Sequence, residues 1–360
     1  MRVVICGGGV IGACMAYFLS LRGAQPLVVE RTRLACGASG KSGGFLALDW
    51  CDGTPLERLS RRSFYLHEHL TETVAGDWGY RRLTTYGATL ALGAGSRLSQ
   101  GAGTPWLSDR VTGRHRLGTP DTTAQVHPER FTEAMMRAAT DQGAELRLGE
   151  VSGLVLSRDG MQLKGVEVGG SFVSCDAAVI AMGPWSHLAA GWLPLPPVYG
   201  LKGHSLLFAT GEAVPGEALF LEYQDERGRS CSPEVFPRAD GTTYVCAISS
   251  DSPVPLDPAD AAPDEGAIER LEELCTRLSP LLAESPILAR QACFRPVTRD
   301  GLPLIGRVPG VSGTYVATGH SVWGILNAPA TGEAIAELIL GAQTQAVDPE
   351  AFDPARQVRL

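Results

Sequence analysis

The sequence predicts an α/β protein with a dinucleotide-binding domain, built from discontinuous segments, into which a second domain of antiparallel sheet is inserted. Three observations support this prediction. Residues 2–30 have the pattern of strand, glycine turn, helix and strand. Residues 200–250 alternate polar and apolar residues over short runs, which is typical of antiparallel sheet. A strand that ends in glycine (176–183) and a final helix (329–341) then return to the α/β pattern.

The composition excludes several classes of protein. The chain has 360 residues, 44% of them hydrophobic and 19% charged, which excludes a disordered chain and allows two domains. The net charge is −8 without a basic stripe, which argues against nucleic acid and anionic membranes as partners. We find neither a targeting segment nor an apolar run that could span a membrane, and we expect a cytoplasmic protein. The nine cysteines are scattered, which favours free thiols and no metal site.

The first glycine turn, GGGVIG at 7–12, fits the pattern G-x-G-x-x-G of dinucleotide-binding proteins. Gly7 permits the tight turn, Gly9 lets the backbone approach a pyrophosphate, and Gly12 lets the helix pack on the strand. Val10 and Ile11 begin the helix, whose free N–H groups attract phosphate. The turn follows a strand and opens a helix, so we expect it to bind a dinucleotide.

Glu30 and Arg31 follow at the end of the second strand. A carboxylate at this place accepts a hydrogen bond from a ribose hydroxyl, and it disfavours the 2′-phosphate of NADP.

A second glycine-rich segment, ASGKSGG at 38–44, is a further candidate anion-binding loop. Its successive N–H groups can surround an anion, and the lysine adds positive charge. A flexible loop is the alternative, although Phe45, Leu46 and Trp50 follow at once and need burial. The candidate residues are Ser39, Gly40, Lys41, Ser42, Gly43 and Gly44.

The other elements follow from periodicity and from glycine and proline stops. We expect helices at 55–75, 127–143, 266–284 and 329–341, a strand pair at 80–93, a surface loop at 94–124, and a surface tail after Gln343. The predicted dinucleotide-binding domain comprises residues 1–75, 125–200 and 286–345, the inserted substrate domain residues 76–124 and 201–285, and the C-terminal tail residues 346–360.

Six segments together resemble the FAD-dependent family of D-amino-acid oxidase, glycine oxidase and sarcosine oxidase. They are GGGVIG, Glu30, ASGKSGG, DAAVIAMGPW, RPVTRDGLPLIG and ATGHSVWGILNAPATG. The resemblance covers roughly residues 2–342, and SGKSGGFLALDW is most similar to a little-characterised branch of oxidoreductases. It implies FAD as cofactor and a Rossmann-like FAD-binding domain of the glutathione-reductase type, with an inserted antiparallel β-sheet substrate domain.

The resemblance also implies which residues contact FAD. Val151 matches the position whose backbone meets the adenine, and Gly183 and Trp185 match a segment beside the cofactor. The segment 319–325 matches the one along the pyrimidine edge of the isoalloxazine, where a helix N-terminus can stabilise the negative charge of reduced flavin. Its candidate residues are Gly319, His320, Val322, Trp323, Gly324 and Ile325.

The resemblance assigns a substrate carboxylate to Arg295, whose planar guanidinium binds carboxylates in a bidentate manner. The alternative is a structural arginine paired with Asp300 or Glu234. Glycine-oxidase-like members carry a tyrosine at the position of Glu234, and an arginine near Val322 or Trp323. A carboxylate at 234 would repel an acidic substrate or bind a second amino group.

Three further residues carry open alternatives. Ser249 aligns with the substrate pocket, or it is an ordinary strand hydroxyl. His320 contacts the flavin or orients the amine, or it makes a structural hydrogen bond. Cys293 matches the cysteine that bears the flavin covalently in the sarcosine-oxidase branch, or it is a small buried thiol.

The predicted activity is oxidation of the CH–NH bond of an amino acid or secondary amine by hydride transfer to flavin N5. The imine then hydrolyses, and O2 or another electron acceptor reoxidises the flavin, with H2O2 as the product from O2. A flavin monooxygenase or an NAD-linked dehydrogenase is an alternative, although the sequence has no second glycine fingerprint. A non-catalytic assembly or trafficking factor stabilised by FAD is the other alternative, favoured by the departures at Glu234 and Val322.

Overall fold

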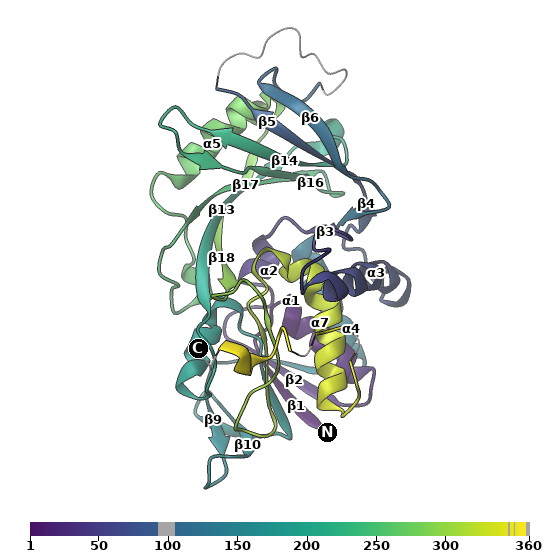
Figure 1. The fold of residues 1–360 in the computed structure, drawn as a ribbon, viewed down its shortest axis with the longest axis vertical. Coiled ribbons are helices and arrows are strands. Elements are labelled where there is room, and N and C mark those ends of the chain that lie inside the picture. The colour runs from purple at the N-terminus through teal and green to yellow at the C-terminus, as the bar shows by residue number, and fades with distance from the viewer. Residues whose placement is uncertain (93–104, 345, 349, 358–360) are drawn as a thin grey trace.

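The computed structural model describes residues 1–92, 105–344, 346–348 and 350–357. Its main features are two large sheets, one above the other along the long axis of the molecule (Figure 1). The lower one, the parallel sheet, has six strands. Its order is β19 (Leu304–Arg307), β20 (Thr314–Thr318), β12 (Ala177–Ile180), β1 (Arg2–Cys6), β2 (Gln25–Glu30) and β8 (Glu145–Leu148). All neighbours in it are parallel except β19 and β20. The first βαβ unit is therefore confirmed, with α1 (Val10–Ser20) as its crossover helix.

The upper one, the large sheet, has eight strands. Its order is β18 (Ile287–Val297), β13 (Tyr199–Ala209), β17 (Thr242–Ser250), β16 (Glu234–Pro237), β14 (Glu217–Gln224), β5 (Thr84–Leu90) and β6 (Val111–Gly118), with β15 (Ser230–Cys231) paired to β14. The antiparallel pairing expected for residues 200–250 is confirmed, while β14 and β5 pair in parallel. Helix α5 (Ala267–Leu278) and the short α6 (Pro280–Glu284) replace the single helix expected at 266–284, because Ser279 starts a new turn by accepting the N–H of Leu282.

Two small sheets complete the strands. One has the order β11 (Ser171–Ser174), β10 (Leu163–Val168) and β9 (Val151–Leu156). The other joins β3 (Phe45–Ala47), β7 (Thr123–Gln125) and β4 (Arg81–Arg82).

The structure corrects three expectations. The segment expected as a loop at 94–124 contains β6 and β7, whose glycine and threonine content hides the strand pattern, while its residues 94–104 lie outside the described chain. Strand β18 was expected within the 286–345 segment of the dinucleotide-binding domain, yet it pairs along the whole of β13 in the large sheet. The tail after Gln343 is anchored, because Val347 and Phe352 are buried and the N–H of Ile305 donates to the carbonyl oxygen of Phe352 at 2.9 Å.

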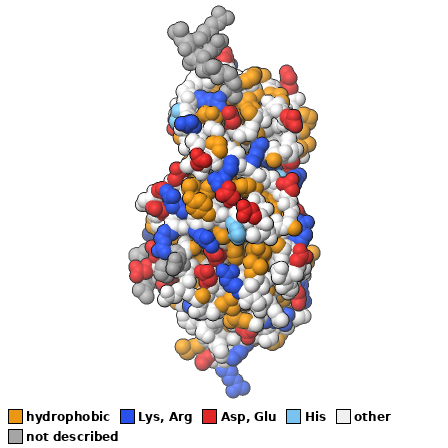
Figure 2. All heavy atoms as spheres, turned by 90° about the vertical axis from the view of Figure 1, so that its right-hand side faces the viewer, with side chains coloured by type: hydrophobic (Ala, Val, Ile, Leu, Met, Phe, Trp, Pro, Cys, Tyr) orange, Lys and Arg blue, Asp and Glu red, His pale blue; other side chains and the backbone are white. Residues whose placement is uncertain are grey.

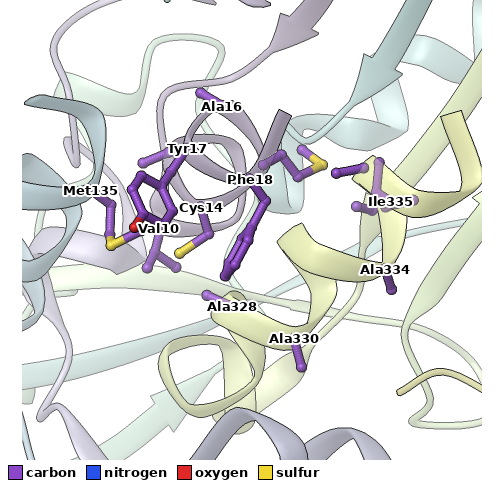
Figure 3. Close-up of a cluster of buried hydrophobic side chains, with 14 of the residues drawn as sticks. Val10, Cys14, Ala16, Tyr17, Phe18, Met135, Ala328, Ala330, Ala334 and Ile335 are labelled. Carbon is purple, nitrogen blue, oxygen red and sulfur yellow. The ribbon is translucent and has the colours of Figure 1, made fainter. Parts of the chain in front are cut away.

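Helix α1 is buried almost all round, between α4 (Pro128–Asp141) and α7 (Gly324–Ile339). Figure 3 shows Tyr17 of α1 beside Met135 of α4, and Phe18 directed towards α7. The helices approach closely at Gly332, where a Cβ atom would lie 2.7 Å from the backbone carbon of Cys14. This packing fixes the start of α7 relative to the first glycine turn.

Helix α7 begins at Gly324, five residues before the start expected at Pro329, which lies inside the helix. Proline has no N–H and leaves the carbonyl four residues earlier without its helical partner. Buried His67 of α3 (Glu57–Thr73) supplies the replacement, since its Nε2 lies 2.9 Å from the carbonyl oxygen of Ile325. The Ser63 hydroxyl accepts the N–H of Ala330 at 3.0 Å. Side chains of α3 therefore permit a proline inside α7.

The surface shows no single charge sign on the face in Figure 2, where acidic and basic side chains are interspersed with apolar ones. All nine cysteines are free thiols. None of the helices among the described residues has the length and apolar character needed to cross a membrane.

Candidate active site

A large cavity lies between the parallel sheet and the large sheet, with about 1950 Å³ of free space when its open mouth is included. One end is lined by the first glycine turn and the end of β2, and the other by β16, β17, β18 and the start of α7. Ligand sites of α/β proteins form in this way, beyond the carboxyl ends of parallel strands. The two ends have different chemistry and are described in turn.

The first glycine turn has the geometry of a dinucleotide loop. Gly7 has a φ of +115°, and its N–H donates to the carbonyl oxygen of Val29 at 2.8 Å, which ties the turn to β2. A Cβ atom on Gly12 would lie 2.1 Å from the carbonyl oxygen of Gly7, so only glycine lets α1 start here. The N–H of Val10 donates to the hydroxyl of Ser39 at 2.9 Å. Gly9, Val10 and Ile11 line the cavity at the start of this helix, whereas Gly12 lies behind it.

Glu30 is held at the end of β2 by two backbone donors. Its Oε2 accepts the N–H of Gly8 at 2.7 Å, and its Oε1 accepts the N–H of Thr32 at 3.0 Å. Both Glu30 and Arg31 line the cavity. Arg31 pairs with Glu150 at 2.6 Å and donates to the carbonyl oxygen of Leu256 at 2.9 Å, so it joins the loop before α5 to this end of the cavity.

The second glycine-rich segment lines the cavity in part. It contains the single turn α2 (Ala38–Lys41), after which the chain passes under the large sheet. A Cβ atom on Gly43 would lie 2.2 Å from the ring of Phe236, and one on Gly44 would lie 2.0 Å from a backbone oxygen. Ser39, Ser42, Gly43 and Gly44 line the cavity, but Gly40 and Lys41 do not. The Lys41 ammonium instead donates to the carbonyl oxygen of Ala292 at 3.1 Å.

The residues of this end fit a dinucleotide cofactor. The hydroxyl of Ser42 is buried at the cavity and has no hydrogen-bond partner within the described chain, which leaves it for a ligand. Beside Gly9 a Cβ atom would meet only the Ser39 hydroxyl, at 3.1 Å, so the backbone there is open to a close approach. These features match what a pyrophosphate needs at a helix N-terminus.

The predicted contacts of the adenine end also lie along the cavity. Val151, Gly183 and Trp185 all line it. Gly183 has a φ of +54°, and the indole N–H of Trp185 donates to the carbonyl oxygen of Pro255 at 2.7 Å. The loop that carries Pro255 and Pro258 therefore covers this side of the cavity.

The segment before α7 lies at the other end. His320, Val322, Trp323, Gly324 and Ile325 line the cavity, and Gly319 lies outside its lining. His320 is buried, and its Nε2 lies 3.0 Å from the hydroxyl of Thr331. Burial lowers the pKa of His320 from 6.5 to about 3, so the imidazole is neutral. His320 therefore does not act as a charged group here.

Arg295 extends from β18 across the face of the large sheet. A Cβ atom on Gly203 would lie 3.3 Å from the Arg295 guanidinium, so the glycine leaves room for it. The guanidinium donates to the hydroxyl of Ser249 at 3.3 Å. Ser249 itself is not part of the cavity lining, whereas Arg295 and the neighbouring Cys293 and Glu234 are. Asp300, one of the two alternative partners considered for Arg295, pairs with Arg356 at 2.9 Å.

Aromatic rings surround this end of the cavity, and most were not identified from the sequence. Phe45 stacks on Phe236 with ring centroids 5.5 Å apart, and Trp50 meets Phe220 at 4.8 Å and Trp323 at 6.4 Å. Six rings line this end of the cavity, and they are called the aromatic wall below: Phe45, Trp50, Phe220, Phe236, Tyr244 and Trp323. The alternation of β16 and β17 places Glu234, Phe236, Tyr244 and Cys246 on one face, and that signal was available in the sequence.

Cys293 is buried at the cavity wall. Burial raises the pKa of its thiol, although the charges of Arg295 and Lys41 oppose this shift. The structure thus keeps Cys293 as a protonated thiol.

Comparisons with known proteins agree with this site. Residues 2–338 match the family model described as FAD dependent oxidoreductase. A glycine oxidase of Pseudomonas aeruginosa is 29% identical over 98% of this chain and 98% of its own. A Schizosaccharomyces pombe protein, whose name gives only the class oxidoreductase, is 29% identical over 98% of this chain and 97% of its own. The crystal structure of a Geobacillus kaustophilus glycine oxidase covers 99% of both chains with a TM-score of 0.81 and 24% identity, which shows a shared fold.

The comparisons confirm the predicted family, the Rossmann-type fold with additional sheets, and FAD as the cofactor. The chain belongs to the FAD-dependent oxidoreductase family that includes glycine oxidase, and it is an oxidoreductase that uses FAD.

Proposed function

We propose that the protein oxidises the CH–NH bond of an amino acid or secondary amine, with O2 as acceptor and H2O2 as product. The observation that carries this proposal is the Arg295 guanidinium, which lines the cavity and has only the Ser249 hydroxyl as a side-chain hydrogen-bond partner among the described residues. A guanidinium stays charged and keeps donors free for a carboxylate. The glycine oxidases among the relatives act, by name, on such a substrate.

Each end of the cavity has its own task in this proposal. The turn around Gly9, the carboxylate of Glu30 and the Ser42 hydroxyl hold the adenosine diphosphate part of FAD. FAD, when bound, supplies the acceptor for the hydride of the substrate. The start of α7 at Gly324 supports negative charge at its N-terminus. In this assignment the parallel sheet serves the cofactor and the large sheet serves the substrate.

The aromatic wall shapes the substrate end. Its rings line the same cavity as Arg295 and Glu234 and present apolar surface to it. Electrostatic contacts to a substrate are stronger in such surroundings than in water. Arg295 then fixes the carboxylate, and the α-carbon is oriented by one bidentate contact.

The test is anaerobic mixing of the holoenzyme with a panel of amino acids and amines, followed by the loss of the flavin absorption band. We expect one substrate class to bleach the flavin, and Arg295→Ala to weaken that reaction by at least about 100-fold, since a lost charged hydrogen bond costs about 3 kcal/mol. Exposed Arg299, four residues away, provides the matched control Arg299→Ala, which we expect to behave as wild type. A holoenzyme that no member of the panel bleaches would contradict the proposal. Peroxide formation on readmission of air tests the acceptor.

A further inference from the structure

Glu234 is the first residue of β16 and faces the aromatic end of the cavity. Its neighbours across the sheet are Cys246 of β17 and Phe220 of β14. The thiol of Cys246 donates to its Oε2 at 3.4 Å. Within the described part of the chain the carboxylate has no ion-pair partner, although the charge of Arg295 acts on it. Glu234 is thus a carboxylate with open acceptor sites inside the cavity.

Two carboxylates line the cavity among the described residues, and only one of them is open to a ligand at the substrate end. Glu30 lies beside the first glycine turn, and both its oxygens accept backbone N–H groups. Glu234 lies beside Arg295, with a thiol as its one hydrogen-bond donor. An arginine and a carboxylate that line the same cavity, with the charge of one acting on the other, match the two charges of an amino-acid zwitterion.

The chemistry of amine oxidation requires a proton acceptor at this end. An amine arrives mostly as ammonium at neutral pH, since α-amino groups and lysine titrate at about 8 and 10. A hydride leaves the α-carbon only when the nitrogen lone pair is free. The other titratable side chains at this end do not serve as the acceptor. Burial raises the pKa of two thiols and of one phenol, which therefore stay protonated. Arg295 is a cation, and the Nε2 of His320 is hydrogen-bonded to the hydroxyl of Thr331. These thiols and the phenol are Cys246, Cys293 and Tyr244.

We propose that Glu234 binds the substrate ammonium and accepts its proton, while Arg295 holds the carboxylate. This inference rests on the proposed function. This step is a proton transfer: an N–H bond of the ammonium breaks, an O–H bond forms on the Glu234 carboxylate, and neither group is oxidised or reduced. The amine keeps the lone pair, and the α-C–H electron pair then passes as hydride to the flavin, which is reduced, while the substrate becomes an iminium ion. The proton leaves Glu234 for solvent after the product departs.

The surroundings of Glu234 support this role. Burial raises the pKa of Glu234, whereas the charge of Arg295 and the thiol of Cys246 lower it. Phe220 is the neighbour of Glu234 on β14, and its ring contacts that of Phe236, two residues along β16. Such apolar rings disfavour the charged carboxylate when no cation is present. A general base is most effective with a pKa near the working pH.

The first arm of the test measures binding without turnover. α-Aminoisobutyrate has no α-hydrogen and cannot be oxidised, and isobutyrate is the same molecule without its amino group. Binding of both to the holoenzyme is measured by calorimetry and by the flavin spectrum, in wild type and Glu234→Gln. We expect Glu234→Gln to weaken α-aminoisobutyrate at least tenfold and to leave isobutyrate unchanged or bound more tightly. Equal effects on both ligands, or none, would overturn the inference.

The second arm measures the pH dependence of flavin reduction by an amino acid that the panel identifies. In Glu234→Gln we expect reduction at pH 7 to fall about 100-fold and to recover about tenfold per pH unit towards the pKa of the free amine. A variant with a structural defect alone would lose the same fraction at every pH, which would overturn the proposal. Exposed Glu222 on β14 provides the control Glu222→Gln, which we expect to match wild type.

Three outcomes separate this inference from the proposed function. A wild type that is bleached, with the same pH profile in Glu234→Gln, leaves the proposed function intact and refutes the role of Glu234. An effect confined to diamino acids would show that Glu234 binds a distal amino group, which also refutes it. A wild type that nothing bleaches refutes the proposed function, while the binding arm still reports on Glu234.

Discussion

Two glycines of the first turn, Gly9 and Gly12, meet different surroundings, so a single added methyl group acts differently at each. On Gly12 a Cβ atom would lie 2.1 Å from the carbonyl oxygen of Gly7 and 3.4 Å from the side chain of Ile5. The oxygen belongs to the backbone of a tight turn, so α1 would have to move by about 1 Å away from β1. Overpacking of this kind costs about 1–3 kcal/mol, and we expect Gly12→Ala to lose about 3 kcal/mol of unfolding free energy.

Gly9 presents the opposite case. Its φ of −79° and ψ of 179° suit any residue, and a Cβ atom would meet only the flexible hydroxyl of Ser39, at 3.1 Å. We therefore expect Gly9→Ala to change the stability of the FAD-free protein by less than about 0.5 kcal/mol. The methyl group would occupy the cavity at the start of α1, where a pyrophosphate approaches. The added methyl group would then crowd the bound cofactor and destabilise the complex with FAD but not the FAD-free protein. We therefore expect the FAD affinity to fall about 10- to 100-fold.

The assay compares urea unfolding of the FAD-free proteins with FAD titration followed by flavin fluorescence. Gly191→Ala is a matched control, because no atom lies within 4 Å of its added Cβ, and we expect it to be neutral in both measurements. The reasoning is refuted if Gly12→Ala unfolds like wild type, or if Gly9→Ala binds FAD with unchanged affinity.

The remaining predictions concern a buried histidine, a half-buried ion pair and a cavity thiol. Burial lowers the pKa of His67 from 6.5 to about 4, so the folded state keeps it neutral while the unfolded chain takes up a proton. The unfolding free energy should fall by roughly 3 kcal/mol on account of His67 as the pH drops from about 6.5 to about 4. Urea unfolding at both pH values should show a smaller fall in His67→Gln. An equal fall in the variant would contradict the neutral, buried state of His67. Asp264, whose side chain is 30% exposed, binds the ammonium of buried Lys202 at 2.5 Å. Asp264→Asn should cost about 1–3 kcal/mol of unfolding free energy because it leaves that charge without its carboxylate; a cost below about 0.5 kcal/mol would show that water replaces the carboxylate. Because burial disfavours the thiolate of Cys293, acid precipitation should release the flavin into the supernatant; a coloured pellet that Cys293→Ala abolishes would show a covalent bond instead.

The elements that local sequence determines were predicted best. The first βαβ unit and the helix α4 are contiguous, and each is specified by its own periodicity and glycine stop. The contact between Gly12 and Gly7 spans five residues, so the G-x-G-x-x-G spacing already contains it. Helix α7 was placed too late because a proline usually starts a helix, whereas here His67, distant in sequence, compensates for it.

The features that depend on pairing between distant strands could not be read locally. Alternation predicted strands in residues 200–250, but it does not say which face meets the cavity or which strand lies next to which. The proximity of Glu234 and Arg295 arises only because β18, β13, β17 and β16 are neighbours in that order. The aromatic wall has the same origin, since its rings come from five separate segments. Phe352 is buried because its segment contacts β19, and the polar composition of the tail does not predict that contact.

The strand order of the parallel sheet also determines when the sheet can be completed during translation. β1 pairs with β12, and β12 pairs with β20, so the first strand of the chain lies in a sheet that also needs one of the last. At about 5–20 residues per second, roughly 15–60 s separate the emergence of β1 from that of β20. Until β20 and α7 have emerged, the β20-facing edge of β12 and the α7-facing side of α1 have no partner, so a nascent chain exposes them to chaperones or to aggregation. Capture of FAD therefore belongs to the end of translation, and a chain cut before Thr318 is expected to be insoluble rather than merely inactive.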